Sequence, residues 1–407
     1  MLRQASPDDR LSADTMAVVL AGGKGTRLGP LTKHVCKPAL PFAAAWRNID
    51  FTLSNCVNSE IGRIGVATQH KPEALLAHLR NVWNAPNGAP GASIQAWPAD
   101  LRAPVTGYAG TADAVYRNLD LIRRQECGLV LVLAGDHVYS MDYRPMLEQH
   151  RRCGADVTIA CVGIEPDQAS QFGILSVDDR RRVAAFVEKP LRIEDVPAGD
   201  RVLASMGIYV FNTAVLVRAL QRDALLHDSG HDFGSDILPR LVHEARIHAY
   251  PFEGDAAPLG GYWRDVGTPA AYWQAHLELL EASPQQQLDD SRWPLHGARI
   301  RPEFTARYAA ASGRAGPDRS LVADGCRIDG SVQRSVLFSN VRVERSASVD
   351  RSVILPGAVI GRNCRLSGVI VSDGCRIPDG MVVAAQDLQP IVITAEDLEE
   401  NLALSCA

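Results

Sequence analysis

Toward its C-terminus the chain carries an aliphatic repeat with a period of six residues. Val322 and Ile328 begin it; Leu337, Val343, Val349 and Leu355 are each six apart, and Ile354, Ile360 and Leu366 continue one register over. Small and polar residues fill the positions between. This pattern predicts a left-handed parallel β-helix of hexapeptide repeats, with each aliphatic side chain in a narrow core. A Val-rich antiparallel meander would instead alternate with a period of two.

We expect this domain, over residues 321–407, to serve regulation or oligomerisation. Many hexapeptide-repeat enzymes are acyltransferases that need a histidine base within the repeats. The last histidine of this chain is His296, which precedes them.

Residues 16–282 alternate short apolar runs with helical patterns, which is typical of an α/β domain with a mostly parallel sheet. The predicted strands are Ala17–Leu20, Ile61–Thr68, Leu129–Ala134, Val157–Val162, Gly173–Val177, Val183–Val187 and Met206–Phe211. Connections between the last three are short, so we expect the sheet to be mixed at one edge. Apolar residues recur at helical spacing over residues 112–122. Residues 1–15 are expected to be flexible, and residues 283–320 to form a linker or docking segment.

Composition limits the classes of function. Lys and Arg number 42 and Asp and Glu 47, so the net charge is −5, with no long block of one sign. This argues against bulk binding to nucleic acid or an anionic membrane, and still allows a local phosphate pocket. No apolar run suggests a membrane span or a signal peptide. Nine cysteines without a C-x-x-C pair indicate reduced thiols, a cytoplasmic location and no zinc.

A glycine-rich turn follows the first predicted strand, at residues 21–28. Backbone N–H groups of such a turn can cradle phosphate oxygens, and lysine or arginine adds charge. The glycine spacing matches neither a P-loop nor a dinucleotide fingerprint, and by itself the turn could be a tight strand-to-helix connection. Arg27 and Lys37 add cations at a spacing suited to a nucleotide's diphosphate.

Several motifs in fixed order resemble the sugar-nucleotide pyrophosphorylases, a family of nucleotidyltransferases. Residues 20–28 with Lys37-Pro38 look like the family signature, and residues 49–59 are similar to the glucose-1-phosphate adenylyltransferases, the bacterial ADP-glucose pyrophosphorylases. The resemblance continues through residues 110–115, 133–137, 186–190, 204–211, 231–234 and 262–268, and through the β-helix. It implies a Rossmann-like nucleotidyltransferase domain over residues 16–282.

The resemblance also implies a reaction. The phosphate of glucose 1-phosphate would attack the α-phosphorus of ATP, giving ADP-glucose and pyrophosphate for glycogen (α-glucan) biosynthesis. No covalent enzyme intermediate is needed, so catalysis would rest on positioning and charge neutralisation. The family further implies Mg²⁺, phosphorylated or nucleotide effectors, and a homotetramer.

Two acids and two cations are the expected catalytic residues. Asp136 follows a buried strand, where open α/β sheets bind ligands, and with Asp265 it is expected to bind Mg²⁺. Asp265 taken alone could instead pair with Arg264 or cap the next helix. Arg27 and Lys37 would hold the β- and γ-phosphates.

The remaining site residues follow from the resemblance alone. Glu188 would bind sugar hydroxyls and Lys189 the phosphate, although by themselves they are a solvated pair at a strand end. The other expected sugar-site residues are Tyr108, Gly173 and Ser205, and the expected nucleotide-site residues are Leu20, Ala21, Gly22, Gly23, Gly25, Thr26, Gln69, Gly110 and Thr111. Arg47 and Arg124 match positions implicated in effector binding.

Departures from the family cluster in its regulatory and base-reading segments. Its basic Thr-Asn-Lys-Arg run, which binds an activator in well-known members, is residues 32–35 here, with His34 and Val35 replacing two cations. Ala43-Ala44 replaces a Gly-Gly pair, Gly107 a frequent Trp, and Asp100-Leu101 a Gln pair beside the adenine site. We therefore expect unusual or feeble allosteric activation, and the nucleotide preference stays open.

Other functions also stay open. A non-catalytic regulatory subunit would not need Arg27, Lys37, Asp136, Lys189 and Asp265, all of which are present, whereas a pyrophosphorylase for another nucleotide or sugar would.

Two further motifs are given no catalytic role. Asp232-Phe233-Gly234 resembles a kinase metal motif but lacks that family's companion motifs. His227 and His231 are more simply loop histidines than metal ligands.

Overall fold

The computed structural model describes residues 11–85, 88, 91–103, 107–197, 199–252, 262–281, 291–297, 303–305, 317–386 and 389–399. These residues form two compact units. The first comprises the residues up to Gly23 with 52–135 and 139–263, and the second comprises 24–51, 136–138 and those from Arg264 onward. Residues 24–51 and 136–138, inside the first predicted domain, thus group with the C-terminal part. A helical turn begins at Leu11, ahead of the predicted start of regular structure.

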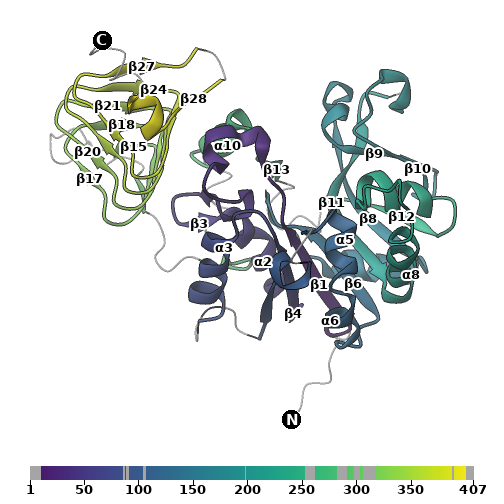
Figure 1. The fold of residues 1–407 in the computed structure, drawn as a ribbon. Helices are drawn as coiled ribbons and strands as arrows, with labels where there is room; N and C mark the ends of the chain where they lie inside the picture. The colour runs from purple at the N-terminus through teal and green to yellow at the C-terminus, as the bar shows by residue number, and fades with distance from the viewer. Residues whose placement is uncertain are drawn as a thin grey trace. The chain divides into compact units, whose positions relative to one another are not determined.

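The first unit is built on a nine-stranded mixed sheet, in the order β10-β9-β11-β6-β1-β4-β5, with β8 beside β11 and β12 beside β8 (Figure 1). β1, β4, β5 and β6 are parallel to one another. The bounds are Thr15–Ala21 (β1), Arg63–Thr68 (β4), Ser93–Pro98 (β5), Leu129–Ala134 (β6), Val157–Ile164 (β8), Gly173–Val177 (β9), Val183–Glu188 (β10), Val202–Asn212 (β11) and Ile247–Pro251 (β12). All seven predicted strands are present, and β5 and β12 are found in addition.

Antiparallel pairing extends further into the sheet than expected. β11 is antiparallel to β6, β8 and β9, so the sheet is mixed in its interior as well as at the β9–β10 edge. The register between β11 and β8 shifts between Ser205 and Tyr209. Such an irregularity redirects side chains locally, and Ser205 is one of the predicted site residues.

The helical pattern over residues 112–122 belongs to two helices, α5 (Thr111–Tyr116) and α6 (Leu119–Arg123). Between them Asn118 Nδ2 donates to the carbonyl of Ala114 at 2.7 Å and to the hydroxyl of Tyr108 at 3.0 Å. Side-chain bonds of this kind compete with continued helix.

The other helices are α2 (Asn48–Asn58), α3 (Glu73–His78), α4 (Ala99–Arg102), α7 (Arg144–Arg152), α8 (Thr213–Asp223), α9 (Leu238–Leu241) and α10 (Pro269–Glu278). The 3₁₀ and π segments are η1 (Thr26–Thr32), η2 (Lys37–Ala39), η3 (Leu79–Trp83), η4 (Pro166–Gln171), η5 (Ile193–Asp195) and η6 (Phe233–Ile237), and two-stranded pairs join β2 (Pro41–Phe42) to β3 (Trp46–Arg47) and β7 (His137–Tyr139) to β13 (Trp263–Asp265). None of the helices described here combines the length and the apolar character of a membrane-spanning segment.

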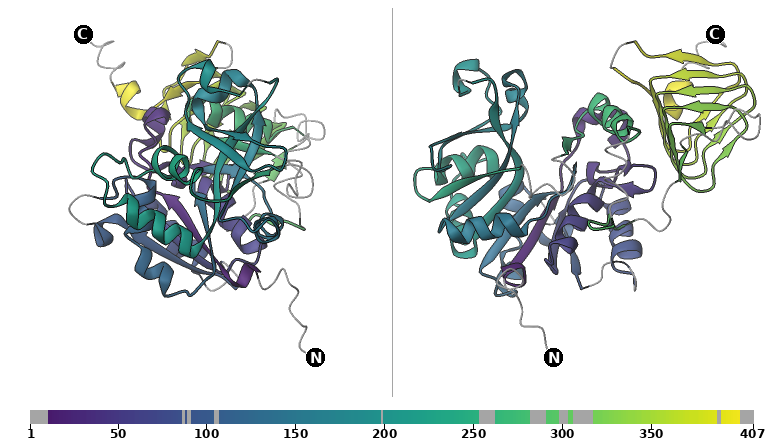
Figure 2. Two further views of the ribbon diagram at one scale, coloured as in Figure 1. Left: turned by 90° about the vertical axis from the view of Figure 1, so that its right-hand side faces the viewer. Right: turned by 180° about the vertical axis from the view of Figure 1, so that it is seen from behind.

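The C-terminal part of the second unit is a left-handed parallel β-helix, whose coils are stacked in Figure 2. Its three sheets run β14-β16-β19-β22-β25-β28, β15-β18-β21-β24-β27 and β17-β20-β23-β26, and only β14 pairs antiparallel among the described strands. The bounds are Glu303–Thr305 (β14), Pro317–Asp318 (β15), Ser320–Val322 (β16), Arg327–Ile328 (β17), Ser331–Gln333 (β18), Val336–Leu337 (β19), Arg342–Val343 (β20), Ser348–Asp350 (β21), Val353–Ile354 (β22), Val359–Ile360 (β23), Arg365–Ser367 (β24), Val369–Val371 (β25), Arg376–Ile377 (β26), Val382–Ala384 (β27) and Ile391–Ile393 (β28).

The central coils of the β-helix are one residue shorter than three full hexapeptides. Val336 pairs with Val353 and Val353 with Ile370, so partners on successive coils are 17 positions apart. One side of these coils is therefore five residues long, which explains the register change in the sequence. The first coil is shorter, because Leu321 pairs with Val336, and the last is longer, because Val371 pairs with Ile393. The inner cluster continues through Ile354 rather than Leu355.

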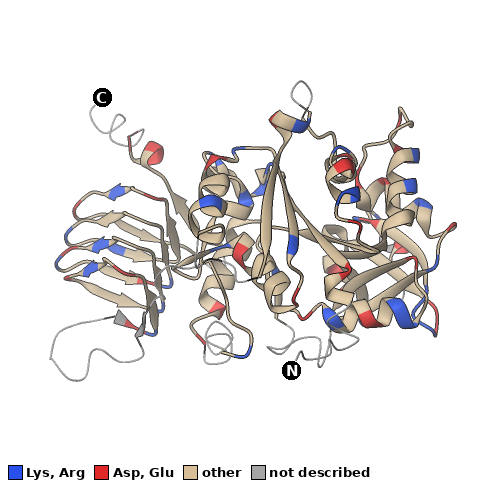
Figure 3. Cartoon of the chain, turned by 90° about the horizontal axis from the view of Figure 1, so that it is seen from below, with Lys and Arg blue, Asp and Glu red and all other residues tan. Residues whose placement is uncertain are grey.

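Arginines stand in register on the outer face of the third sheet. Arg327 pairs with Arg342, Val359 pairs with Arg376, and all three arginines are exposed. Figure 3 shows basic residues on successive coils. The third sheet thus carries exposed arginines on β17, β20 and β26, with Val359 of β23 between Arg342 and Arg376.

A buried histidine of α10 joins separate segments of the second unit. His276 Nε2 accepts the Ala43 N–H at 3.2 Å, and its Nδ1 donates to the carbonyl of Tyr272 at 2.8 Å. Its ring lies 4.2 Å from that of Phe42 and 5.8 Å from that of Phe338 in the β-helix. His276 therefore packs both on the β2–β3 hairpin and on the β-helix.

This histidine makes stability depend on pH. Burial lowers the pKa of His276 to about 4, against about 6.5 in an unfolded chain. Between these values only the unfolded state takes up the proton, so the free energy of unfolding falls as pH drops from 6.5 to 4, by about 3 kcal/mol in total. We expect Tm to fall more steeply between pH 7 and pH 5 in the wild type than in His276→Gln, measured by circular dichroism. The exposed His34→Gln should keep the wild-type slope; equal slopes in all three proteins would contradict the assignment.

Candidate active site

Two carboxylates of the second unit share one buried ammonium group. Lys37 Nζ lies 2.5 Å from Asp265 Oδ1 and 3.1 Å from Asp136 Oδ2. Arg27 Nη2 is 3.3 Å from Asp265 Oδ2, and His137 Nε2 is 3.7 Å from Asp136 Oδ1. The structure thus brings together all four residues predicted to act on metal and phosphate.

Short local elements hold these side chains in place. Lys37 begins η2, where Pro38 suits the first turn, and Asn48 Nδ2 donates to the Lys37 carbonyl at 3.0 Å. Asp136 directly precedes β7, and Asp265 ends β13, the strand that pairs with β7. Asn48 is fully buried and is not among the residues predicted from the sequence. The sequence feature that could have identified Asn48 is its position directly before the motif of residues 49–59, where it is a polar residue next to an apolar one.

Opposite charges dominate the titration of the cluster. Burial opposes ionisation of Asp265, but Lys37, His137 and Arg27 outweigh it and hold the pKa of its carboxyl well below its usual range. Burial also works to lower the pKa of Lys37, but Asp136 and Asp265 outweigh it, so this pKa is raised. Asp265 is therefore ionised and Lys37 protonated at neutral pH.

The donors of this cluster fit a divalent cation such as Mg²⁺. Mg²⁺ prefers hard oxygen ligands and is commonly bound by one or two carboxylates, with water and substrate phosphates as the other ligands. Since one ammonium nitrogen reaches both Asp136 and Asp265, a single small cation can do so too. Among the described residues no three His, Cys, Asp or Glu side chains are arranged to hold a metal, so the other ligands would come from water or substrate.

The alternative roles for Asp265 are filled by other residues. Arg264 pairs with Glu278, with its Nε 3.1 Å from Oε2. The N-terminus of α10 is capped by Thr268, whose hydroxyl accepts the Ala271 N–H at 3.2 Å. Asp265 is thus available for the cluster with Lys37.

The first part of the glycine-rich turn lies in the first unit. Leu20 and Ala21 end β1, and Gly22 and Gly23 follow it. A Cβ added to Gly22 would lie 3.3 Å from that of Gln69, whereas one on Gly23 would meet nothing within 4 Å. The backbone at Gly23 is therefore open to a ligand, as the predicted phosphate cradle requires.

The rest of the turn lies in the second unit and starts η1. Gly25 adopts φ 63°, a left-handed conformation that favours glycine. Its carbonyl accepts the Leu28 N–H at 3.0 Å and the Thr32 hydroxyl at 2.9 Å. Thr26 and Arg27 follow on the surface. The turn thus presents Arg27 from a rigid corner.

Gln69 and Tyr108 are joined by two hydrogen bonds. The Tyr108 N–H donates to Gln69 Oε1 at 2.8 Å, and Gln69 Nε2 donates to the Tyr108 carbonyl at 3.3 Å. The Tyr108 hydroxyl donates to the carbonyl of Trp97 at 3.0 Å and accepts from Asn118 at 3.0 Å. This hydroxyl is used by the fold, so a contribution of Tyr108 to the sugar site, which stays a prediction, would come from its other atoms.

Gly110 and Thr111 are held by the segment after α8. A Cβ on Gly110 would lie 2.3 Å from the carbonyl oxygen of His231, so only glycine fits. The Thr111 hydroxyl donates to Asp232 Oδ2 at 2.7 Å and accepts the Phe233 N–H at 3.0 Å. The kinase-like motif therefore has a structural role next to a predicted nucleotide residue.

The two loop histidines differ in environment. His227 is exposed. His231 Nδ1 lies 2.7 Å from the buried carboxylate of Asp223, which also bonds Ser229 and Arg240 at 2.7 Å each. His231 thus belongs to an ion-pair network that holds the loop beside Gly110.

The Glu188 carboxylate lies against two glycines. Gly173 pairs with Glu188 across β9 and β10, and a Cβ there would lie 2.8 Å from Glu188 Oε2. A Cβ on Gly234 would lie 2.5 Å from the same oxygen. Lys189 Nζ is 2.9 Å from Glu188 Oε1, and 58% of the Lys189 side chain is exposed. The first unit thus combines an acceptor and an accessible cation, as binding a sugar phosphate requires.

Ser205 contacts a tyrosine that lies in one of the sequence motifs and to which the sequence alone assigned no role. Its hydroxyl lies 3.2 Å from that of Tyr209 and accepts the Gly207 N–H at 3.2 Å. Burial raises the pKa of Tyr209, and the charges of Glu188 and Asp232 add to the effect. Ser205, Tyr209 and Glu188 therefore lie in one electrostatic environment.

The expected effector residues are placed differently. Arg47 Nη1 donates to the carbonyl of Ala39, and burial lowers the pKa of its guanidinium. Arg124 is 74% exposed and lies 3.8 Å from Asp120. Arg47 belongs to the second unit and Arg124 to the first.

The segment that departs from the family's basic run meets an acid of the chain itself. Lys33 Nζ lies 2.6 Å from Glu396 Oε2, and His34 Nε2 lies 3.9 Å from Glu396 Oε1. Glu396 is in a helical turn after the β-helix, where Thr394 accepts the Asp397 N–H at 3.2 Å. The remaining cation of the run is therefore already paired.

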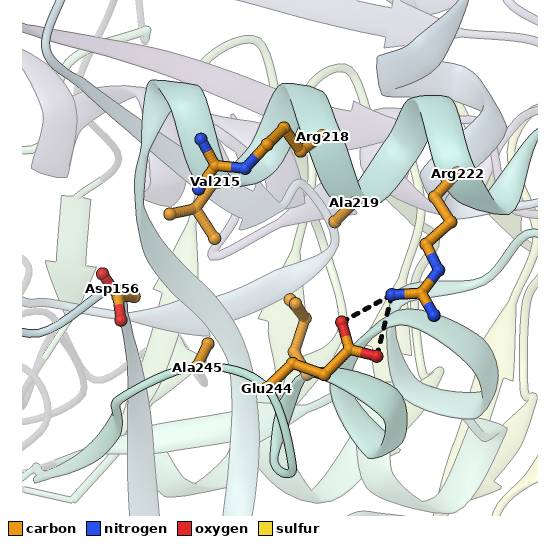
Figure 4. Close-up of a pocket in the computed structure, with 8 residues that line it drawn as sticks. Asp156, Val215, Arg218, Ala219, Arg222, Glu244 and Ala245 are labelled. Carbon is orange, nitrogen blue, oxygen red and sulfur yellow. Dashed lines mark hydrogen bonds and ion pairs between the residues drawn. The ribbon is translucent and has the colours of Figure 1, made fainter.

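A cavity of about 310 Å³ lies elsewhere in the first unit, beside α8 (Figure 4). Two of its lining residues, Arg222 and Glu244, form an ion pair, with Nη1 2.7 and 2.8 Å from the two carboxylate oxygens (Figure 4). Its lining residues are Asp156, Val215, Arg218, Ala219, Arg222, Leu241, Glu244 and Ala245. None of the predicted site residues is among them.

Comparison with protein families identifies both parts of the chain. Residues 16–282 match the family model described as nucleotidyl transferase, and residues 304–390 match the model described as GlmU-like, C-terminal hexapeptide. The first match spans more than half of the chain.

Curated relatives match nearly the whole chain. The chain is 46% identical over 379 residues to glucose-1-phosphate adenylyltransferase 2 of Alkalilimnicola ehrlichii, covering 92% of this chain and 89% of the relative. It is 45% identical to glucose-1-phosphate adenylyltransferase of Dechloromonas aromatica, over 92% and 86% of the two chains. The enzyme of the same name from Nitrosococcus oceani is 44% identical, over 96% and 91%.

Proposed function

The chain belongs to the glucose-1-phosphate adenylyltransferases of the nucleotidyl transferase family, and from this premise we propose that it transfers the adenylyl group of ATP to α-D-glucose 1-phosphate. The products are ADP-glucose and pyrophosphate, for glycogen or another α-glucan. The observation that carries the proposal is the cluster of Lys37, Asp136 and Asp265. In it, Lys37 Nζ lies 3.1 Å from an oxygen of Asp136 and 2.5 Å from an oxygen of Asp265.

Asp136 and Asp265 are proposed to hold Mg²⁺, which supplies positive charge to the phosphate oxygens when it is bound. Lys37 and Arg27 bind oxygens of the departing pyrophosphate and stabilise its charge. The open backbone at Gly23 donates to phosphate. These groups need only position the substrates and neutralise their negative charge, since the phosphate of glucose 1-phosphate is itself the nucleophile.

Glu188 and Lys189 are proposed to bind glucose 1-phosphate. The carboxylate accepts hydrogen bonds from sugar hydroxyls, and the ammonium group pairs with the phosphate. The exposed Lys189 is free to follow the phosphate, while Gly173 and Gly234 leave room for the carboxylate.

The function is tested with a matrix of nucleotides against sugar 1-phosphates, with pyrophosphate release measured in the presence of Mg²⁺. We expect ATP with glucose 1-phosphate to give the highest kcat/KM. No release from that pair would contradict the proposal. Release from another pair would assign a pyrophosphorylase of different specificity, and release from none would favour the regulatory-subunit alternative.

The glycine next to Glu188 provides a prediction for the sugar site. The methyl group of Gly234→Ala would overlap Glu188 Oε2, from which the added Cβ is only 2.5 Å. We expect the KM for glucose 1-phosphate to rise about tenfold, or about 1.4 kcal/mol, and the KM for ATP to change less than twofold in steady-state assays. Gly163→Ala in β8, where an added Cβ would come no nearer than 3.5 Å to the Arg201 side chain, is the control. Equal rises in both KM values would argue against a sugar-specific role.

Activation by phosphorylated effectors is expected to be weak. Each lost contact to a phosphate removes about 1.5–3 kcal/mol; His34 and Val35 replace two cations, and Lys33 already pairs with Glu396. Initial rates in titrations with fructose 1,6-bisphosphate, fructose 6-phosphate and pyruvate should change little. Strong activation by the bisphosphate would contradict this prediction.

We also propose that the protein is a cytoplasmic homotetramer whose β-helix takes part in subunit contacts. Light scattering coupled to size exclusion would determine the number of subunits, and removal of residues beyond 317 should change it.

A further inference from the structure

The proposed catalytic role does not explain why Lys37 is buried. A side chain that receives incoming phosphate is expected to be accessible, as Arg27 is, with 53% of its side chain exposed; for Lys37 the value is 6%. The Lys37 ammonium instead lies between one oxygen of Asp265 and one of Asp136, at 2.5 and 3.1 Å. These are the two acids proposed to hold the metal.

The cluster is electrically balanced without a metal. Two carboxylates face the cations of Lys37 and Arg27, with His137 Nε2 3.7 Å from Asp136 and 4.0 Å from Asp265. A divalent cation on the same oxygens would stand within a few ångströms of the ammonium group, and repulsion is strong where little water screens it. Arg27 contacts the other oxygen of Asp265 and extends into solvent, so it leaves room for the cation. Lys37 and the metal are therefore competitors.

We propose that Lys37 is a resident counter-ion of the Asp136–Asp265 pair, which weakens metal binding until phosphate oxygens offer its ammonium group another partner. The inference rests on the proposed function. Its consequence is linkage: if phosphate draws Lys37 away, phosphate and metal strengthen each other's binding by the same factor. Only the side chain has to move, since Asn48 holds the Lys37 carbonyl and Pro38 the following turn.

The test measures Mn²⁺ binding to the full chain without nucleotide, from the electron paramagnetic resonance signal of free Mn²⁺. We expect Lys37→Met to bind one Mn²⁺ at least tenfold more tightly than the wild type. Lys37→Gln, which keeps a hydrogen-bond donor, should show the same gain and serves if the Met variant is unstable. Lys71→Met, at an exposed lysine of the first unit, should bind as the wild type does.

A second substitution locates the gained site. In Lys37→Met with Asp136→Asn the gain should disappear, because one of the two acids has lost its charge. The inference is overturned if the Lys37 variants bind Mn²⁺ no more tightly than the wild type, or if the gain survives loss of Asp136. An active wild type with unchanged Mn²⁺ binding in the variants would sink this inference alone, whereas inactivity of the wild type in the nucleotide matrix would sink the proposed function.

Discussion

Asp136→Asn is expected to lower kcat by about 10³-fold, the scale on which one electrostatic partner of a reacting centre contributes. The substitution keeps the shape of the side chain and removes the charge that, with Asp265, would hold the metal. Lys37 Nζ lies 3.1 Å from Asp136 Oδ2, so the variant also loosens the cation meant for the leaving pyrophosphate. Steady-state pyrophosphate release from ATP and glucose 1-phosphate measures the effect.

The fold should survive this change. Asp136 is 31% exposed, and an amide of the same size leaves no cavity, so Tm is expected to change by only a few degrees. Asp329→Asn, which removes an acid paired with Arg327 on the β-helix, is the matched control and should keep the wild-type rate. Near-normal turnover in Asp136→Asn would remove this residue from the mechanism.

Lys189→Gln is expected to raise the KM for glucose 1-phosphate by about 10²-fold and to leave the KM for ATP within about threefold. A charge-assisted hydrogen bond to phosphate is worth about 1.5–3 kcal/mol, which corresponds to a factor of about 10 to 150. The wild-type side chain is 58% exposed and pairs only with its neighbour Glu188 among the contacts described, so the effect should fall on binding rather than stability.

The conservative variant separates charge from shape. Lys189→Arg keeps the positive charge and should recover much of the affinity, whereas Lys71→Gln should have no effect on either KM. A Lys189→Gln enzyme with an unchanged KM for glucose 1-phosphate and a raised KM for ATP would place Lys189 at the nucleotide instead.

Local patterns were sufficient to predict seven of the nine strands of the main sheet, all except β5 and β12. β6 and β9 have the bounds that their apolar runs indicate, and the hexapeptide period predicts the β-helix, because both depend on which side chains must be buried. The pattern was insufficient where a single polar side chain intervenes. Asn118 separates α5 from α6 through a local bond to Ala114 and a second bond to Tyr108, and such side-chain bonds leave no trace in hydrophobic spacing.

The candidate site, too, has features that the sequence predicts and features that it does not. The residue types follow from the motifs alone, whose order identifies the family and which contain Arg27, Lys37, Asp136, Asp265 and Glu188. Residue type does not say which charges neutralise one another, because that depends on distances between segments far apart in the chain.

Those pairings depend on how the folded chain packs. The tertiary structure placed Lys37 between two acids 99 and 228 residues away in the chain, directed the Tyr108 hydroxyl into the fold, and set Gly234 against Glu188. The physical reason is that burial and opposite charge act through space: a buried ammonium group must find carboxylates wherever the packed backbone brings them.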